Sequence, residues 1–507
     1  MRALTALVSL AAVAAAFPMA TLAATPLSYE DARHLLNRTG FGATDAEIRH
    51  FVGMTREEAA GALLADTRTV ALTPPPAWTR DPGPLRYPRG ESASETEKKQ
   101  FRQEQIRDGL ELRGWWIEEM VRTPSPLTER MTLFWHNHFV SGQQKVKLTQ
   151  LMYRQNVTLR THALGRFGDL LHAIARDPAM VIYLDNAQNR KGTPNENFAR
   201  EAMELFTLGE GHYSEQDIKE AARSFTGWSL DRDTGQFVFR RLIHDYGQKT
   251  VLGKSGNLDG DDVVDILLAR SETAEFITRK LWREFVSPDP DEAEVKQIAA
   301  RFRDSRYDIK VALHALLTSE GFYAPQNRGV LVKSPVDLVV GTLRQFGLRP
   351  GEPVPFAVAT AAMGQNLFSP PNVKGWPGGE AWINTSTLLA RKAFLDRLFR
   401  ADDAAGRMNA AATPTMADAL APKSASGDDE QELSRKIRFM RTMDRGLKSV
   451  QFDSDAWFGA LKATPDARTA AATRMLLAYA PQAEPDPASE PLAIVRQIVL
   501  DAAYQLK

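Results

Sequence analysis

Apolar residues recur at intervals of three and four positions along most of the chain, and this spacing predicts amphipathic α-helices. Thr44 and Glu47 have the spacing of a capping box at a helix start. Pro126 and Pro335 each follow a serine and suit the first helical position. The helical pattern covers residues 28–66, 125–230, 261–286, 308–322 and 333–347. The sequence therefore predicts a mainly α fold built on one large multi-helix domain.

A few stretches depart from this pattern. Phe237, Val238 and Phe239 follow a polar turn, and they predict a small β-hairpin inserted among the helices. Residues 73–100 begin with three consecutive prolines and continue with Pro, Gly and charge, which predicts a flexible insertion. Residues 401–430 are rich in Ala, Asp and Ser and predict a linker or mobile loop. We therefore expect a main helical domain over residues 25–400 and a helical C-terminal region over residues 431–507.

The first residues have the layout of a secretory signal peptide. Arg2 precedes an apolar, Ala-rich run, and small residues close the segment, so residues 1–24 are expected to be removed near Ala23 or Ala24. The run is shorter than the about 20 apolar residues that cross a bilayer, and no later stretch of that length lacks charge. We expect a soluble periplasmic or secreted protein without a stable membrane span.

Composition excludes several classes of site. The chain has no cysteine, which excludes thiolate zinc sites, iron–sulfur clusters, covalent c-type haem and thiol catalysis. It has 63 basic and 63 acidic residues, so no excess of positive charge indicates nucleic acid as a partner. Gly-x-Ser-x-Gly, P-loop, dinucleotide-binding and His-Glu-x-x-His motifs are absent. No nucleotide cofactor is indicated, and the metal, if there is one, stays unknown.

His138 is the first residue that could carry chemistry. On a helical wheel it shares one side with the apolar residues of 127–139, whereas His136 falls opposite, near Glu129. The two imidazoles therefore cannot act as ligands from one face, and His138 alone should point at the core. It is either a buried histidine bonded to a backbone carbonyl or carboxylate, or a catalytic or metal-ligating group.

Two carboxylates in residues 195–209 are harder to explain by folding alone. Residues 195–209 predict a helix, and its wheel puts Glu201 inside the apolar arc and Glu204 at the edge. A buried carboxylate is costly unless it is paired or binds a metal. One interpretation is a structural ion pair with Arg223 or Arg154. The other is a carboxyl of raised pKa, or a divalent-metal ligand, near the imidazole at 138.

Further polar residues could line an approach to such a centre. Asp185 and Asn189, with Asn195 and Glu196, could line a cleft or bind Ca²⁺, although Asx turns explain them equally well. His244 lies next to Asp245 and near Lys249, an acid/base grouping of unknown geometry. A Pro/Gly-rich loop over 369–380 carries Lys374 and Trp376, and Trp376 with Trp382 either stacks on sugars or anchors the loop.

Several segments together carry a family resemblance. They are Leu36 to Gly42, Phe134 to Phe139, Asn195 to Gly209, Ala222 to Trp228, Lys333 to Pro335 and Pro370 to Gly378. On these the chain resembles the bacterial family called domain of unknown function 1800, over roughly residues 28–395, with the tail from about 400 outside the strong match. The resemblance implies exported helical proteins without an established activity. It also implies a possible partner, an exported protein of the unknown-function family 1501, whose members resemble sulfatase-like and phosphatase-like enzymes.

Two functions from different classes stay open. The first is an accessory or partner-binding protein of the bacterial cell envelope. The alternative is an envelope enzyme in which His138, Glu201 and Glu204 form a buried acid/base or metal centre. In that enzyme Asn195, Glu196 and His244 would lie on the approach, and Asp185, Asn189, Arg223, Lys374 and Trp376 would contribute to binding.

Overall fold

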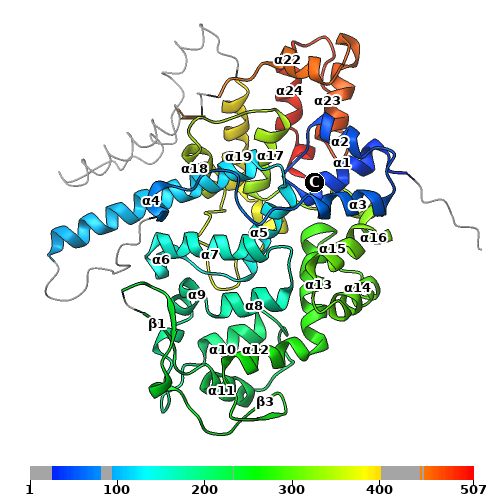
Figure 1. Ribbon diagram of the computed structural model, residues 1–507. Coiled ribbons are helices and arrows are strands. Elements are labelled where there is room, and N and C mark those ends of the chain that lie inside the picture. The colour runs from blue at the N-terminus through cyan, green and yellow to red at the C-terminus, as the bar shows by residue number, and fades with distance from the viewer. Residues whose placement is uncertain (1–25, 81–93, 232, 401–445, 448–449) are drawn as a thin grey trace, which may run out of the picture.

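A computed structural model describes residues 26–80, 94–231, 233–400, 446–447 and 450–507. The predicted signal peptide and the predicted linker at 401–430 lie outside these residues. The described part is mainly helical and has two small two-stranded antiparallel sheets (Figure 1). The predicted mainly α fold with a small β-hairpin insertion and a helical C-terminal region is therefore confirmed. None of the described helices combines the length and the apolar character needed to cross a membrane.

Local capping signals set where the first helices begin. Ser28, Thr44 and Thr55 each cap a helix, and in every case the acidic residue three positions on completes the capping box. They start α1 (Tyr29–Thr39), α2 (Asp45–Phe51) and α3 (Arg56–Ala65). Proline occupies the first helical position of α5 (Pro126–His138) and α17 (Pro335–Gln345), as predicted.

One hydrophobic core lies mainly in the lower half of the molecule in Figure 1. Besides parts of α3 and α5 it is built from α7 (Thr149–His162), α8 (Phe167–Ala175), α9 (Pro178–Tyr183), α10 (Asn197–Glu204), α11 (Glu215–Ser224), α12 (Gly260–Ala269), α13 (Ser271–Phe285), α14 (Glu292–Asp304), α15 (Ile309–Leu317) and α16 (Glu320–Tyr323).

A second core joins both ends of the described chain. It combines residues of α1 and α2 with α4 (Glu95–Arg122), α6 (Gln143–Val146), α17, α18 (Val354–Ala362), α19 (Thr385–Leu398), α22 (Ser454–Ala460), α23 (Arg468–Leu476) and α24 (Pro491–Leu500). α5 and α7 contribute to both cores, because Trp135 and Leu159 belong to the first and Leu133 and Met152 to the second. α5 therefore lies between the two cores.

The strands form two hairpins. The predicted one pairs β1 (Trp228–Leu230) with β2 (Phe237–Phe239), and Ser229 faces Val238 in its register. A second hairpin, which the pattern did not predict, pairs β3 (Lys249–Val251) with β4 (Lys254–Gly256). Its turn places Leu252 and Gly253 at positive φ, and β3 packs on α11.

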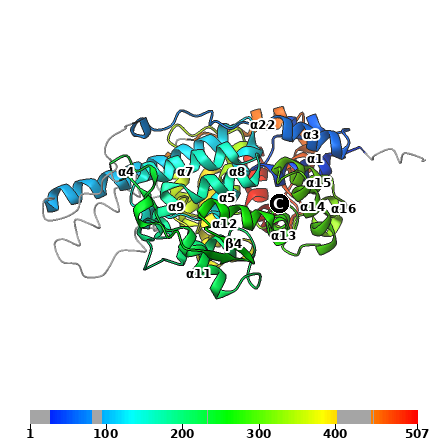
Figure 2. The same cartoon turned by 60° about the horizontal axis from the view of Figure 1, so that its bottom comes forward.

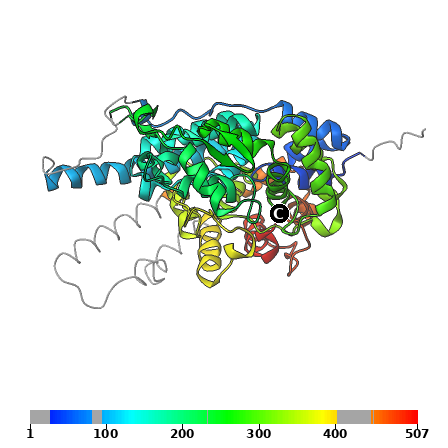
Figure 3. The same cartoon turned by 90° about the horizontal axis from the view of Figure 1, so that it is seen from below.

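The stretch predicted to be a flexible insertion has defined structure on both sides of the undescribed residues 81–93. Thr73 is buried, its N–H donates to Glu119 of α4 at 2.6 Å, and its carbonyl accepts from the Trp115 indole at 3.0 Å. From Glu95 the chain is helical, and the first half of α4 extends beyond the body in all three views (Figure 1, Figure 2 and Figure 3).

A buried carboxylate connects α17 to elements that are far away in sequence. Asp337, in the first turn of α17, accepts hydrogen bonds from Arg130 of α5 and, at 2.8 Å, from the Lys507 ammonium. The Arg130 guanidinium also pairs with Glu284 of α13 at 3.0 Å. Asp337 and Arg130 are almost fully buried, so each charge depends on the other for its stabilisation.

We expect Asp337→Asn to lower the free energy of unfolding by about 3–5 kcal/mol, because it removes the buried carboxylate that Arg130 and Lys507 share and leaves Arg130 with Glu284 alone. Urea unfolding at pH 7 followed by circular dichroism measures the change. Asp304→Asn, at an exposed position, is the matched control and should have almost no effect. A loss below about 1 kcal/mol at position 337 would contradict this account.

Candidate functional site

His136 fixes the loop that follows α18. Its Nε2 accepts a hydrogen bond from the Phe368 N–H at 3.2 Å, and its ring packs against those of Trp116 and Trp376. The prediction that only His138 points at the core is wrong, because His136 is just 1% exposed. A wheel assumes one buried side, whereas α5 is enclosed by two cores. Burial, followed by the nearby Arg113 charge, lowers the pKa of His136 to about 3.

Asn137 fixes the same loop further along. Its Oδ1 accepts from the Trp376 N–H at 2.8 Å, and its Nδ2 donates to the Trp376 carbonyl at 3.3 Å. Gly375 has φ +80°, and a Cβ there would lie 2.3 Å from Asn137 Oδ1, so only glycine fits. Trp376 and Trp382 are 5% and 7% exposed. They anchor the loop, and the interpretation that they stack on sugars is wrong.

His138 binds the end of α10. Its Nε2 donates to the Phe206 carbonyl at 3.2 Å, and its Nδ1 accepts from the Lys280 ammonium of α13 at 3.0 Å. This is the kind of contact that the structural interpretation of His138 predicts. Burial, together with the Lys280 charge, holds the pKa of His138 well below its usual range. Burial also lowers the pKa of Lys280, to about 8.

Glu201 has a different environment from the one that the wheel predicts. α10 ends at Glu204, well before Gly209, and Glu201 is half-buried at the surface of this short helix. Within the described residues its carboxylate has no hydrogen bond or ion pair. Burial, and next the charge of Glu204, raise the pKa of Glu201.

The predicted structural ion pair of Glu201 with an arginine is wrong. Arg223 pairs with Asp245 at 2.7 Å and with Glu220 at 2.9 Å, and Arg154 donates to the Thr234 carbonyl at 3.4 Å. Both arginines are thus engaged elsewhere, and the carboxylate at 201 is left without a cationic partner in the described chain.

Glu204 is the partnered member of the two carboxylates. Its Oε2 accepts from the Tyr213 hydroxyl at 2.8 Å, and its Oε1 lies 4.0 Å from the Lys374 ammonium. Lys374 belongs to the loop that Asn137 holds, and the Lys374 charge also lowers the pKa of Glu201. Burial, and next the charge of Glu201, raise the pKa of Tyr183. We call these five residues the carboxylate face: Tyr183, Glu201, Glu204, Tyr213 and Lys374.

The predicted His/Glu centre is not brought together. No hydrogen bond or ion pair in the described residues joins His138 to Glu201 or Glu204, and neither carboxylate contributes to the pKa shift of His138. The turn after α10 presents the Phe206 carbonyl to His138, whereas the carboxylates of α10 lie at the surface. Where side chains are described, no group of three or more His, Asp or Glu is placed to hold a metal ion.

The polar residues before α10 are engaged in loop structure. Asp185 pairs with Lys145 at 2.7 Å. Asn189 is fully buried, donates to the Ala222 carbonyl at 2.8 Å and accepts from the Asn195 N–H at 2.9 Å. The Asn195 side chain in turn accepts from the Asn197 N–H at 3.0 Å, and Glu196 lies 3.5 Å from Arg200. The contact from Asn195 to Asn197 is an Asx turn, and the others are ion pairs and hydrogen bonds within the fold, which supports a structural role for these residues.

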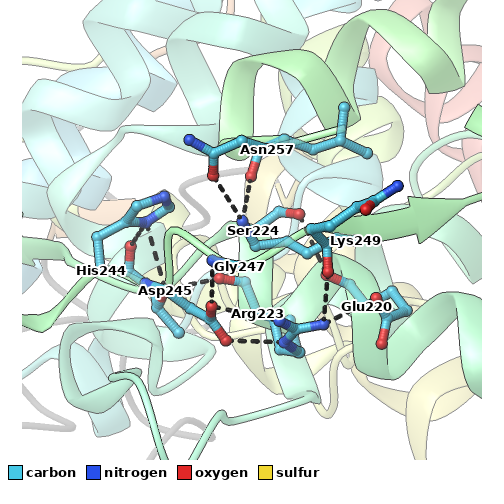
Figure 4. Close-up of polar contacts among 12 residues, drawn as sticks. Glu220, Arg223, Ser224, His244, Asp245, Gly247, Lys249 and Asn257 are labelled. Atoms are coloured by element: carbon cyan, nitrogen blue, oxygen red, sulfur yellow. Dashed lines mark hydrogen bonds and ion pairs between the residues drawn. The ribbon is translucent and has the colours of Figure 1, made fainter. Parts of the chain in front are cut away.

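The grouping of His244, Asp245 and Lys249 closes the second hairpin onto α11 (Figure 4). His244 is 2% exposed, and its Nδ1 donates to the Thr226 carbonyl at 2.7 Å. Asp245 pairs with Arg223, as Figure 4 shows, and Lys249 donates to the Leu258 carbonyl at 2.8 Å. Each of the three side chains has a polar partner within the fold, and no hydrogen bond or ion pair in the described residues joins them to the carboxylate face.

Sequence reasoning missed Tyr183, Tyr213 and Lys280. Tyr183 reads as the end of an apolar helix, and nothing local marks Tyr213 as the donor to a carboxylate nine positions earlier. Lys280 follows Phe276 by one helical turn on α13, where an ordinary amphipathic helix also carries lysine. Only the tertiary structure brings these three side chains to the ends of α10.

We expect Glu201→Gln to raise the free energy of unfolding at pH 7 by up to about 1 kcal/mol. The pKa of Glu201 is raised in the folded state, so its ionised form costs stability above the unfolded pKa. The gain should vanish as the pH falls through the folded pKa, where the native side chain is protonated. Urea unfolding at pH 7 and pH 4 measures it, with exposed Glu352→Gln as control. If Glu201→Gln destabilises the protein at pH 7, the carboxylate of Glu201 has a stabilising partner, and this account is contradicted.

His136 should make stability depend on acid. Its pKa is depressed in the folded state, so the unfolded chain binds a proton that the native protein does not, and stability falls as the pH drops from 6.5 towards 3. One such imidazole contributes up to about 1.4 kcal/mol per pH unit. We expect His136→Gln, which keeps an acceptor for Phe368, to flatten the slope of unfolding free energy between pH 6 and pH 4.5 by about that amount.

The matched change His212→Gln, at an exposed position, should leave that slope unchanged. If the unfolding free energies of His136→Gln and His212→Gln both depend on pH as that of the native protein does, His136 is not a buried neutral imidazole.

Comparison with known proteins agrees with the family resemblance that the sequence segments indicate. The family "Protein of unknown function (DUF1800)" matches residues 34–494. The match includes the region from residue 400 to 494, so the expectation that the tail from about residue 400 lies outside the strong match is corrected. Neither the curated proteins nor the solved structures contain a significant match. With nearly its whole length covered by the family match, the chain belongs to the DUF1800 family.

Proposed function

We propose that this chain is an exported accessory protein of the bacterial cell envelope that binds a partner protein through its carboxylate face. The N-terminal pattern of charge, apolar run and small residues supports export. The partner that the family resemblance implies is an exported protein of the unknown-function family 1501.

The observation that carries the proposal is the half-buried carboxylate of Glu201. The other candidate groups, from His138 to His244, have partners inside the fold, whereas Glu201 has no hydrogen bond or ion pair within the described residues. A desolvated carboxylate gains most from a cation that arrives from outside, because the cation lowers the cost of ionisation. A lysine or arginine of the partner is the group that fits.

The surroundings of Glu201 suit a protein interface. Tyr183 and Tyr213 are half-buried beside the two carboxylates, and tyrosine is enriched at interfaces, where it offers apolar area with a polar tip. Lys374 is exposed and only 4.0 Å from Glu204, so its charge limits which cations can approach that carboxylate. Arg200 and Lys374 also lie near enough to Glu201 to lower its pKa, but neither makes a hydrogen bond or ion pair with its carboxylate in the described residues.

One observation favours an enzyme as the alternative. Glu201, with its raised pKa, is suited to donate a proton, while Glu204, which accepts from Tyr213, is suited to take one. This version of the envelope enzyme uses the two carboxylates without His138.

The two proposals separate in one experiment. The native chain is co-produced in a bacterial periplasm with an exported family 1501 protein from the same genome, and the affinity of the purified pair is measured by calorimetry. We expect Glu201→Lys to abolish binding and Glu201→Gln to weaken it at least tenfold, which is about 1.4 kcal/mol for one charge-assisted contact. Glu352→Lys, at an exposed position outside the carboxylate face, should bind like the native chain.

Unchanged affinity in Glu201→Lys would overturn the proposed interface. If Glu201→Gln then fails to complement a deletion of the gene while it still binds the partner, the enzyme alternative is supported.

A further inference from the structure

A cavity of about 470 Å³ lies among α1, α2, α3 and the start of α5, at the upper right of Figure 1. Its volume is in the range of small-molecule sites. None of its lining residues belongs to the carboxylate face, so its use would be independent of the proposed function. Its walls are mainly apolar, with Leu36, Phe51 and Leu63 half-buried along them and Leu127 of α5 buried behind.

Tight backbone contacts keep the cavity from closing at its base. Gly42 has φ +100°, and a Cβ there would lie 3.0 Å from the Gln345 side chain. A Cβ at Gly40 would lie 3.1 Å from Pro126. The turn between α1 and α2 is thus seated directly against α5 and α17, while the side chains that face the cavity, such as Ala46 and Ala62, are too short to fill it.

Arg344 and Glu47, which line the cavity, already satisfy one another. Arg344 donates to the Val121 and Thr123 carbonyls at 3.2 and 3.1 Å and to Glu47 at 3.0 Å, so its charge is neutralised. Glu47 also accepts from the Thr44 N–H at 2.8 Å. These groups have little left to offer a ligand.

Negative charge gathers at the mouth, next to the exposed imidazole of His50. α1, α2 and α3 all end at the cavity, where Thr39, Phe51 and Asp66 mark their C-terminal ends. Helix C-termini carry partial negative charge and favour cations. The exposed Asp66 carboxylate adds a full charge and has no hydrogen bond or ion pair in the part of the chain that the structure describes. α5 begins here with the opposite polarity, but its first residue, Pro126, has no N–H to offer an anion.

We infer that this cavity is a binding site for a small apolar cation, an aromatic or aliphatic amine. The apolar body occupies the space between Leu36, Phe51 and Leu63, and the ammonium group lies at the mouth, where Asp66 and the three helix ends stabilise it. Carboxylates of the same size are disfavoured by the same charges.

Three molecules that share an indole test the inference by isothermal titration calorimetry on the native protein: tryptamine, the neutral indole-3-ethanol and the anionic indole-3-propionate. We expect tryptamine to bind best and indole-3-propionate worst, with at least a tenfold difference in Kd. Asp66→Asn should weaken tryptamine about tenfold and change indole-3-ethanol less than twofold.

Ala62→Phe fills the cavity and should weaken both tryptamine and indole-3-ethanol at least tenfold. Ala65→Phe, on the same helix but exposed and outside the lining, is the matched control and should bind both like the native protein. Equal affinity of tryptamine for the two phenylalanine variants would overturn the site. Indole-3-propionate binding as tightly as tryptamine, or tryptamine binding unchanged in Asp66→Asn, would overturn the ligand class.

Discussion

Hydrogen bonds from three consecutive side chains at the end of α5 hold together segments that are more than 60 residues apart in sequence. His136 and Asn137 bind the backbone of the loop at Phe368 and Trp376, and His138 binds the carbonyl at Phe206. These groups are largely buried, and a buried polar group without its partner costs about 1–3 kcal/mol. The end of α10 and the loop that carries Lys374 are therefore positioned from one helical turn. The carboxylate face depends on α5, because the segments that carry Glu204 and Lys374 are both held by side chains of α5.

Buried charge in this protein follows two different arrangements. In the interior, Asp337 is matched by Arg130 and Lys507, and Glu129 by Arg160 at 2.5 Å, so burial is offset by close pairing. At the surface of α10, Glu201 retains the cost of partial burial with no such compensation. The difference separates carboxylates that serve the fold from one that is free to meet a group from outside.

Local signals were the part of the fold that the sequence could predict. Capping boxes such as Thr44 with Glu47, and prolines such as Pro335, act within one turn of helix, so their outcome depends little on the rest of the chain. The β1–β2 hairpin is equally local.

The environment of each side chain was harder to predict from the sequence. A helical wheel places residues around an axis but does not say how many sides of the helix are covered by other elements. For α5 both sides are covered and His136 is buried, whereas α10 stops at Glu204 and leaves Glu201 half-exposed. Arg223 pairs with Asp245, which lies just before the second hairpin, and no sequence pattern predicted that hairpin.

The two imidazoles of α5 carry their single proton on opposite nitrogens. His136 accepts at Nε2, so its proton lies on Nδ1, whereas His138 donates from Nε2 and accepts at Nδ1. Each tautomer is fixed by a backbone group that cannot turn away without disturbing a core. A proton relay requires a ring to release a proton from one nitrogen while it takes one up at the other, and here that exchange would break both contacts of His138. The tautomers that these contacts imply thus suit the two histidines to a structural role, in which they hold the chain segments around α5 in place.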